Sequence, residues 1–204
     1  QDNGVESKDE MPSYIDEHKI NHGPGIKIGY VVWAPVNCGY HKDHFQYGKL
    51  YQWGRKYGQG YYGDLCINNE SGVAEVIGTW NDAGEQKLKS GPISLSYGQD
   101  SENADQFIYR TASEVKYGRD WCDTEHDYLW NSGSENEPIK TEYDPCPEGW
   151  RVPTWKELNA LQENHSSFVE VNGQYGYWLS GPIEYSEEVP RIFLPAAGMN
   201  THRG

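Results

Sequence analysis

The chain has 204 residues, and its 31 Asp and Glu against 17 Lys and Arg give a net charge of −14 at pH 7. Because nucleic acids and anionic membrane surfaces are bound by clustered Lys and Arg, this balance excludes both as expected partners. No apolar run is long enough to span a bilayer, so this segment is not expected to insert into a membrane.

The N-terminal segment is polar and acidic. Residues 1–12 contain few apolar side chains, and residues 1–22 are therefore predicted to form a mobile leader that acts as a spacer. After residue 22 no stretch has the composition of an interdomain linker, and the remaining length suits one packed domain. We therefore expect a single domain over residues 23–204.

Two scaffold elements are predicted in the first third of the chain. Residues 26–34 alternate apolar and other side chains and predict a strand, which Pro35 ends. Residues 47–57 carry large apolar side chains at helical spacing and predict a helix, for which Gly58 is a natural C-terminal stop.

The middle of the chain, residues 58–140, is rich in Gly, Asn, Asp, Ser and Tyr and has only short strand-like pieces such as residues 73–77. A stretch of this length without strong periodicity inside a compact domain is usually a functional or binding loop region. The sequence therefore predicts that a ligand, if there is one, binds here.

The last third begins with a proline-rich turn over residues 145–153, where the backbone must run extended. Thr154 and Glu157 have the spacing of a capping box at a helix start. A helix is predicted over residues 155–163, with residues 175–180 and 191–195 as paired strands after it. The buried face of that helix is expected to contain Trp155, Leu158 and Leu161, or Leu158 and Gln162.

The four cysteines form an even set with no Cys-x-x-Cys pair and no histidine at zinc spacing, which disfavours a structural zinc site. Disulfides are favoured and would place the protein outside the cytoplasm. The alternative is four reduced, buried thiols. The residues alone leave three pairings open among Cys38, Cys66, Cys122 and Cys146.

Four motifs occur in a fixed order along the chain. They are Trp-Ala-Pro-Val-Asn-Cys-Gly-Tyr at 33–40, Tyr-Gly-Lys-Leu-Tyr-Gln-Trp at 47–53, Cys-Pro-x-Gly-Trp-x-Val-Pro-Thr-x-x-Glu-Leu at 146–158 and Phe-Leu-Pro-Ala-Ala-Gly at 193–198. In this order they resemble the Fibrobacter succinogenes major paralogous domain, a C-type-lectin-like module of secreted proteins, and most closely its Bacteroides branch. The matching segments span roughly residues 22–198.

The resemblance implies an α+β, C-type-lectin-like fold in which two helices surround a small, mostly antiparallel sheet with a long loop region. It favours the disulfides Cys38–Cys146 and Cys66–Cys122. It also implies an extracellular or cell-surface location in Bacteroidetes, secreted or as a lipoprotein, anchored in the outer membrane or periplasmic. Relatives continue past residue 198 into further strands, so another chain is expected to complete the sheet if those strands are missing.

The leading functional hypothesis is a secreted or surface-anchored recognition and adhesion module, which binds glycan or a surface protein through residues 58–140. Exposed aromatic rings stack well on sugar faces. The first alternative is a structural or tip subunit of a surface appendage, which would accept a strand from a partner chain. The candidate contact residues for the leading hypothesis are Tyr61, Tyr62, Trp80 and Trp121.

A metal-dependent enzyme on a lectin-like fold is the second alternative, with mixed His and acidic clusters at residues 41–44 and 120–127 as its candidate sites. No nucleophile elbow or phosphate-binding glycine loop is present, so we expect no enzyme activity and no cofactor. Trp80-Asn81-Asp82 copies the calcium signature of C-type lectins. It stands before the second predicted helix and lacks its Glu-Pro-Asn partner, so calcium is not expected there.

Overall fold

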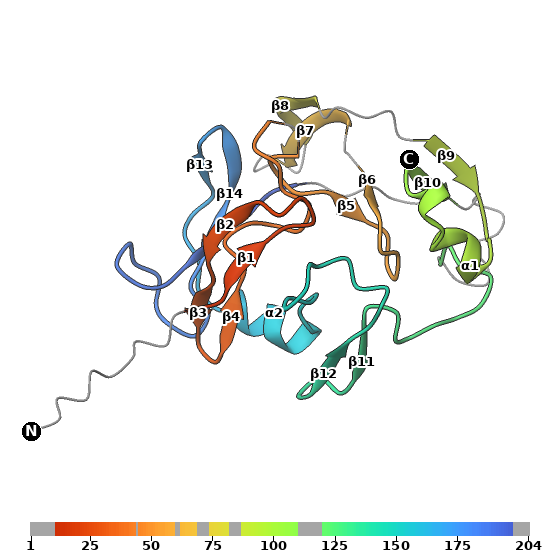
Figure 1. Cartoon of the computed structure of the whole chain (residues 1–204). Coiled ribbons are helices and arrows are strands. Elements are labelled where there is room, and N and C mark those ends of the chain that lie inside the picture. Colours follow the sequence, from red (N-terminus) through yellow and green to blue (C-terminus); the bar gives the residue numbers. More distant parts are fainter. Residues whose placement is uncertain are drawn as a thin grey trace, which may run out of the picture. The chain divides into compact units, whose positions relative to one another are not determined.

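The computed structural model describes residues 11–43, 45–59, 87–109 and 120–197 with their side chains, and residues 62–68 and 74–81 as backbone strands. The chain divides into two compact units. The first comprises Gln1–Val36 and Trp155–Pro195, and the second comprises Asn37–Thr154 and Ala196–Gly204. In Figure 1 the first unit contains both the red and the blue parts of the chain, because its two halves are far apart in sequence. The single domain expected over residues 23–204 stays a prediction.

The first unit is built from short antiparallel strands and one helix. The unit contains the hairpins β1–β2 and β3–β4 and a three-stranded sheet with the strand order β13-β14-β15. The elements are β1 (Ser13–Ile15), β2 (Asn21–Pro24), β3 (Ile26–Ile28), β4 (Val31–Trp33), α2 (Trp155–Leu161), β13 (Val169–Val171), β14 (Gln174–Leu179) and β15 (Ile192–Pro195). The predicted pairing of residues 175–180 with 191–195 is confirmed by β14 and β15.

The leader predicted over residues 1–22 is wrong for its second half, because residues 13–24 form the β1–β2 hairpin. Tyr14 is buried, with 2% of its surface exposed. The Asp16 carboxylate accepts hydrogen bonds from the His18 amide at 2.8 Å, the Ile20 amide at 2.9 Å and His22 Nε2 at 2.8 Å. The hydrogen bonds to this one buried carboxylate hold a polar turn in place. Composition alone had predicted a mobile tail for the same residues. Residues 1–10 lie outside the described residues.

Asp16 makes the hairpin sensitive to acid. Burial acts to raise the pKa of Asp16, but the hydrogen bonds from His22 and the two amides outweigh it and lower that pKa. A lowered folded pKa stabilises the fold above the unfolded pKa of about 3.9, and this contribution is lost as pH falls through the folded pKa. We expect Asp16→Asn to reduce the free energy of unfolding at pH 7 by about 1 to 3 kcal/mol, and the difference from wild type to shrink below pH 4.

Urea denaturation at pH 7 and pH 3 measures this effect. The matched control is Asp43→Asn, since Asp43 is paired with Lys42 at an exposed site. That variant should differ from wild type by less than about 1 kcal/mol. Equal losses for the two variants at pH 7 would show that Asp16 has no special role.

The single strand predicted over residues 26–34 is a hairpin instead. β3 and β4 pair with Ile28 opposite Val31, so the chain reverses over the two residues between them. Gly29 adopts a φ of 63° there, which a residue with a side chain rarely does. The alternation of apolar residues continues through this turn, and therefore the pattern in the sequence did not reveal it.

The core of the first unit is aliphatic. Ile28, Leu161, Leu179 and Ile192 are buried together, and Leu158 packs against them.

The predicted helix over residues 155–163 is confirmed as α2, which presents Leu158 and Leu161 to this core. The prediction that the helix buries Trp155 is wrong, because that side chain is 72% exposed. It lies six residues before Leu161 and thus about 120° away around the helix. Gln162, named in the alternative face, is also exposed.

In its described residues, the second unit has small two-stranded sheets and two short helical turns. Among its described strand pairs, β9 and β10 run parallel and the others are antiparallel. Its elements are β5 (Leu50–Tyr51), β6 (Gly58–Gln59), β7 (Tyr62–Asn68), β8 (Ala74–Asn81), β9 (Lys87–Ser90), α1 (Leu95–Gly98), the 3₁₀ turn η1 (Ser101–Asn103), β10 (Gln106–Tyr109), β11 (Asn131–Gly133) and β12 (Pro138–Lys140). The strand-like piece predicted at residues 73–77 falls largely within β8.

The helix predicted over residues 47–57 is wrong. The segment contains β5 and a turn that leads into β6. Gly48 and Gly54 have φ values of 84° and 77°, which no α-helix contains. A Cβ on Gly54 would overlap with Leu129 Cδ1, so the turn also depends on the close approach of a distant residue. The helical spacing of apolar side chains in this segment therefore does not reflect a helix.

The coarse prediction of an α+β chain with few helices and small, mostly antiparallel sheets is confirmed. Within the described part of the chain, no helix has the length and apolar character that a bilayer crossing requires.

Candidate functional site

The Gln52 side chain holds the turn between β5 and β6, because it makes the two backbone hydrogen bonds that a neighbouring strand would make. Gln52 Nε2 donates to the Ile108 carbonyl at 2.8 Å, and Gln52 Oε1 accepts from the Ile108 amide at 2.9 Å. Both backbone polar groups of a buried residue of β10 are thereby satisfied by one amide side chain. The turn at residues 52–55 is consequently fixed to β10, which is more than 50 residues away in sequence.

Arg55 lies at the centre of this arrangement and is completely buried. Its Nε donates to the Gly98 carbonyl at 2.8 Å, its Nη2 to the Asn103 carbonyl at 2.9 Å, and its Nη1 to the Gln106 carbonyl and to Gln52 Oε1. The first two acceptors are the last residues of α1 and η1, whose carbonyls have no partner within their own helix. A guanidinium at these C-termini also complements the negative end of the helical dipoles.

The charge of Arg55 is retained at neutral pH. Burial lowers the pKa of Arg55 to about 10, which is still well above physiological pH. The Trp121 ring lies 6.0 Å from the guanidinium carbon and adds a cation–π contact. Carbonyl oxygens and an aromatic face thus stabilise this cation in place of a carboxylate.

Next to this buried centre, Trp53 reaches the surface with 44% of its area exposed. Its ring lies 5.1 Å from that of Trp130, edge to face at 73°. Trp130 Nε1 donates to the Arg55 carbonyl at 3.0 Å, and Trp121 Nε1 donates to the Trp53 carbonyl at 2.5 Å. Tyr128, two residues before Trp130, is 67% exposed. The Trp53–Trp130 pair is therefore an accessible aromatic surface whose backbone is fixed by two indole hydrogen bonds.

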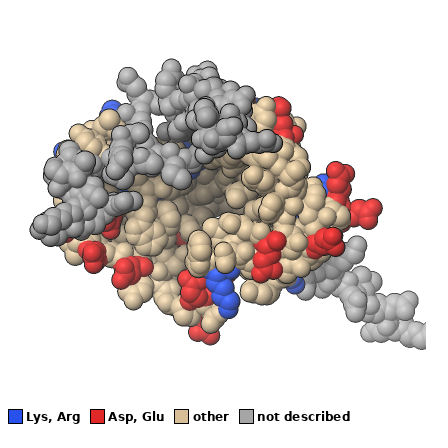
Figure 2. Space-filling view, turned by 180° about the vertical axis from the view of Figure 1, so that it is seen from behind, with Lys and Arg blue, Asp and Glu red and all other residues tan. Residues whose placement is uncertain are grey.

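One face of the molecule is shown in Figure 2. On the face of the molecule in Figure 2, Asp and Glu side chains are spread singly, and the described Lys and Arg there form no patch. This distribution agrees with the net charge of −14. A polyanionic ligand would be repelled over most of such a surface, whereas a neutral ligand would not.

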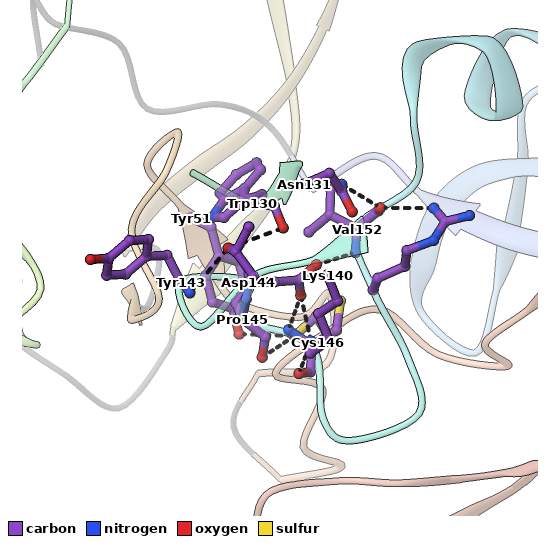
Figure 3. A network of polar contacts seen from close by, with 12 residues as sticks. Tyr51, Trp130, Asn131, Lys140, Tyr143, Asp144, Pro145, Cys146 and Val152 are labelled. Carbon is purple, nitrogen blue, oxygen red and sulfur yellow. Dashed lines mark hydrogen bonds and ion pairs between the residues drawn. The ribbon is translucent and has the colours of Figure 1, made fainter. Parts of the chain in front are cut away.

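A second cluster surrounds two of the cysteines (Figure 3). The Cys38 thiol lies 3.3 Å from Tyr51 Oη and 3.4 Å from the Pro145 carbonyl, and it hydrogen-bonds with the thiol of Cys146. This hydrogen bond, together with burial, raises the pKa of Cys146. Both residues are thiols in the structure, so the predicted pair is brought into contact without a bond between the sulfur atoms.

The loop that carries Cys146 folds around the carboxylate of Asp144, whose side chain is fully buried. Asp144 accepts from the amides of Cys146 and Val152, each at 2.8 Å. Lys140 Nζ donates to Asp144 Oδ1 at 2.8 Å and to the Cys146 carbonyl at 2.7 Å. The aspartate that precedes the Cys-Pro-x-Gly-Trp motif therefore sets the position of its cysteine.

The second predicted disulfide stays a prediction. Cys122 is buried, and burial raises its pKa. Cys66 belongs to β7, which is described only as backbone.

One of the predicted ligand contacts is in the core. Trp121 is 4% exposed and packs with Ile108, Cys122 and Leu129, so it is not available to a ligand. A Cβ on Gly98 would overlap with the Trp121 ring, which shows how closely the backbone covers that ring. An alternating or periodic pattern does not distinguish a buried tryptophan from an exposed one.

The other predicted contacts fall where side chains are not described. Tyr61 lies outside the described residues, and Tyr62 and Trp80 belong to β7 and β8, where only the backbone is described. Sequence reasoning placed Trp53 on a helix and named neither Gln52, Arg55 nor Trp130 as part of a site. The only sequence signal for this turn was Gly54 beside Trp53 and Arg55.

In both clusters considered for metal binding, described side chains make hydrogen bonds within their own loop. His41 Nδ1 accepts from the Asp43 amide at 3.2 Å, and Asp123 Oδ1 accepts from the Thr124 hydroxyl at 3.2 Å. Within the described side chains, no three His, Cys, Asp or Glu residues come together as a metal site would require. His44 and Asp82 lie outside the described residues.

Comparisons with protein-family models, with curated proteins and with solved structures found no match to this chain. Membership in the family that the motifs resemble therefore stays a prediction.

Proposed function

We infer that this chain is a recognition module that binds glycan through the Trp53–Trp130 pair, on a C-type-lectin-like fold and in a protein outside the cytoplasm. The observation that carries this proposal is a tryptophan with 44% of its area exposed, held in place by hydrogen bonds on both sides of the turn. An exposed indole offers a flat apolar face to the C–H groups of a sugar ring.

Preorganisation favours binding at this position. A flexible loop that presents an aromatic ring must be ordered when the ligand binds, and this ordering reduces affinity. At Trp53 the turn is already ordered by Gln52 and by Arg55, so little further entropy is lost. The order of motifs that resembles a secreted lectin-like domain supports the fold family and the location. The thiols of Cys38 and Cys146, already in contact, support a disulfide between them.

Truncation of the exposed ring tests the proposal. We expect Trp53→Ala to weaken glycan binding at least tenfold, about 1.4 kcal/mol, because tryptophans at the centre of contact surfaces are frequent hot spots. A glycan array, run with calcium and again with chelator, selects the ligand, and titration calorimetry measures the affinity of each variant.

The matched control for this test is Trp155→Ala. Trp155 is more exposed, at 72%, and lies at the start of α2 in the other unit. Its loss should leave binding unchanged. An array without any signal in either condition, or equal affinities for wild type and Trp53→Ala, would refute the proposal.

An appendage subunit is the second candidate, and one feature of the first unit favours it. β13 and β15 are the two edges of its three-stranded sheet, and an edge strand offers unpaired backbone groups to another chain. If a partner strand adds there, the chain should be more stable in the presence of a neighbouring surface protein and should co-purify with it. A monomer with unchanged stability in every such mixture would count against this candidate.

A further inference from the structure

The sheet of the first unit presents four rings on one of its faces. The Phe168 ring lies 5.2 Å from that of Tyr177 and 5.9 Å from that of Tyr175, with which it is nearly parallel at 20°. The His165 ring lies 5.3 Å from that of Tyr177 in an edge contact. We refer to Phe168, Tyr175, Tyr177 and His165 as the aromatic sheet face.

The register explains why these rings share a face. Side chains alternate along a strand, so Tyr175, Tyr177 and Leu179 of β14 point to the same side. Leu179 is buried in the aliphatic core with Leu161 of α2, while Tyr177 is 39% exposed. The aromatic sheet face is therefore the continuation of the core-facing side of β14, beyond the residues that pack against α2.

Polar groups border these rings. Glu170 stands opposite Tyr175 in the β13–β14 register, and its negative charge raises the pKa of Tyr175, with burial and a hydrogen bond adding to the effect. His165 Nδ1 lies 2.7 Å from the Ser166 carbonyl, which can only accept, so this nitrogen carries the hydrogen. In the neutral ring, Nε2 is then an acceptor.

We propose that the aromatic sheet face is a second carbohydrate subsite, in which a pyranose ring of a neutral glycan stacks on Tyr177. Phe168 and His165 pack against Tyr177 at interplanar angles of 55° and 78°, so they hold this exposed ring in position. Glu170 and His165 Nε2 are placed to accept hydrogen bonds from sugar hydroxyls. This subsite lies in the other unit from the Trp53–Trp130 pair and does not rest on it.

The polar groups beside the rings favour a neutral glycan over other ligands. A second copy of the chain or an apolar helix would remove the Glu170 carboxylate from water and leave it with the Tyr175 hydroxyl as a donor, and burial of a charge with so little compensation is costly. Sugar hydroxyls supply donors while the C–H faces cover the rings. A glycan with carboxylate or sulfate groups would be repelled by Glu170 and by the acidic surface as a whole.

Titration calorimetry of the full chain with the hexasaccharides of cellulose, xylan, mannan and maltose tests the subsite, with oligogalacturonate as the charged comparison. We expect at least one neutral hexasaccharide to bind, Tyr177→Ala to weaken that binding at least tenfold, and Tyr177→Phe to retain it. Glu170→Gln should weaken it less, because an amide oxygen still accepts. Tyr30→Ala is the matched control, since Tyr30 is 77% exposed in the same unit and lies outside the face. The Tyr177 dependence should persist in Trp53→Ala.

Several results would overturn the subsite. They are the absence of binding to every neutral hexasaccharide, equal affinities for wild type and Tyr177→Ala, and tighter binding of oligogalacturonate. A Tyr177-dependent dimer in sedimentation experiments would assign the face to a second copy instead. If binding depends on Trp53 but not on Tyr177, the subsite is refuted while the proposed function stands. The reverse dependence refutes the Trp53–Trp130 site and keeps the subsite.

Discussion

Under oxidising conditions, Cys146→Ser should reduce the free energy of unfolding by about 4 to 5 kcal/mol, because a Cys38–Cys146 bond closes a loop of roughly a hundred residues. The two thiols already hydrogen-bond to each other, so the fold brings the two partners of this bond together. Its formation transfers two electrons, and releases two protons, to a disulfide of an oxidising partner. Urea denaturation with and without reductant measures the loss.

Substitution of either cysteine, or of both, should reduce the free energy of unfolding by the same amount. Cys38→Ser should cost about as much as Cys146→Ser, and the double variant should cost no more than either, because all three lack the same bond. With reductant present, the differences from wild type should fall to about 1 kcal/mol, the size of a lost thiol hydrogen bond. Peptide mapping without reduction that finds both residues as thiols, or Cys38 linked to Cys66, would contradict the pairing. The same map tests the Cys66–Cys122 bond.

The raised pKa of Cys146 adds a kinetic expectation. The thiolate is the species that reacts with alkylating agents and disulfides, and a raised pKa leaves less of it at neutral pH. In the reduced protein, alkylation of Cys146 should be slower than that of a cysteine in a short unstructured peptide at pH 7.5. A rate equal to that of the peptide would show that the site is open and its thiol unperturbed.

Arg55→Met should reduce the free energy of unfolding by about 3 to 5 kcal/mol. The change removes the donor of one buried and two part-buried carbonyls, and a buried acceptor without a partner costs about 1 to 3 kcal/mol. Arg55→Lys should recover only part of this loss, because an ammonium group lacks the planar fork that reaches several carbonyls at once. Chemical denaturation of each variant gives the values.

Arg191→Met is the matched control for Arg55. Arg191 lies over the Trp178 ring at 4.8 Å and donates to the Ser186 carbonyl at an exposed site, so its loss should cost about 1 kcal/mol or less. Stability of Arg55→Met within 1 kcal/mol of wild type would mean that α1, η1 and β10 do not depend on this guanidinium. A large effect of Arg191→Met would show that the contrast in burial does not determine the cost.

Local signals in the sequence determined a coherent part of the structure. The helix at α2 follows from its apolar spacing, and β14 and β15 follow from their alternation. In each case the residues that decide the element lie within it or within a recognisable motif, so no knowledge of distant packing was needed.

Other elements were decided by contacts between distant residues. Residues 47–57 have helical spacing, yet Leu129 packs so closely on Gly54 that the chain turns there. Asp16 converts a polar tail into a hairpin, because its carboxylate gathers donors that composition does not reveal. Local propensity is a weak prior, and tertiary contacts overrode it at both positions.

The candidate sites, too, were predicted only in part from the sequence, and contacts between distant residues decided the rest. Composition alone made an aromatic, acidic recognition surface plausible, with 16 Tyr and 8 Trp and a net charge of −14. It did not determine which rings are accessible: Trp121 is buried over the Arg55 guanidinium, whereas Trp53 is exposed beside it. Exposure depends on which side chains the distant segments bring together, and only the tertiary structure specifies that.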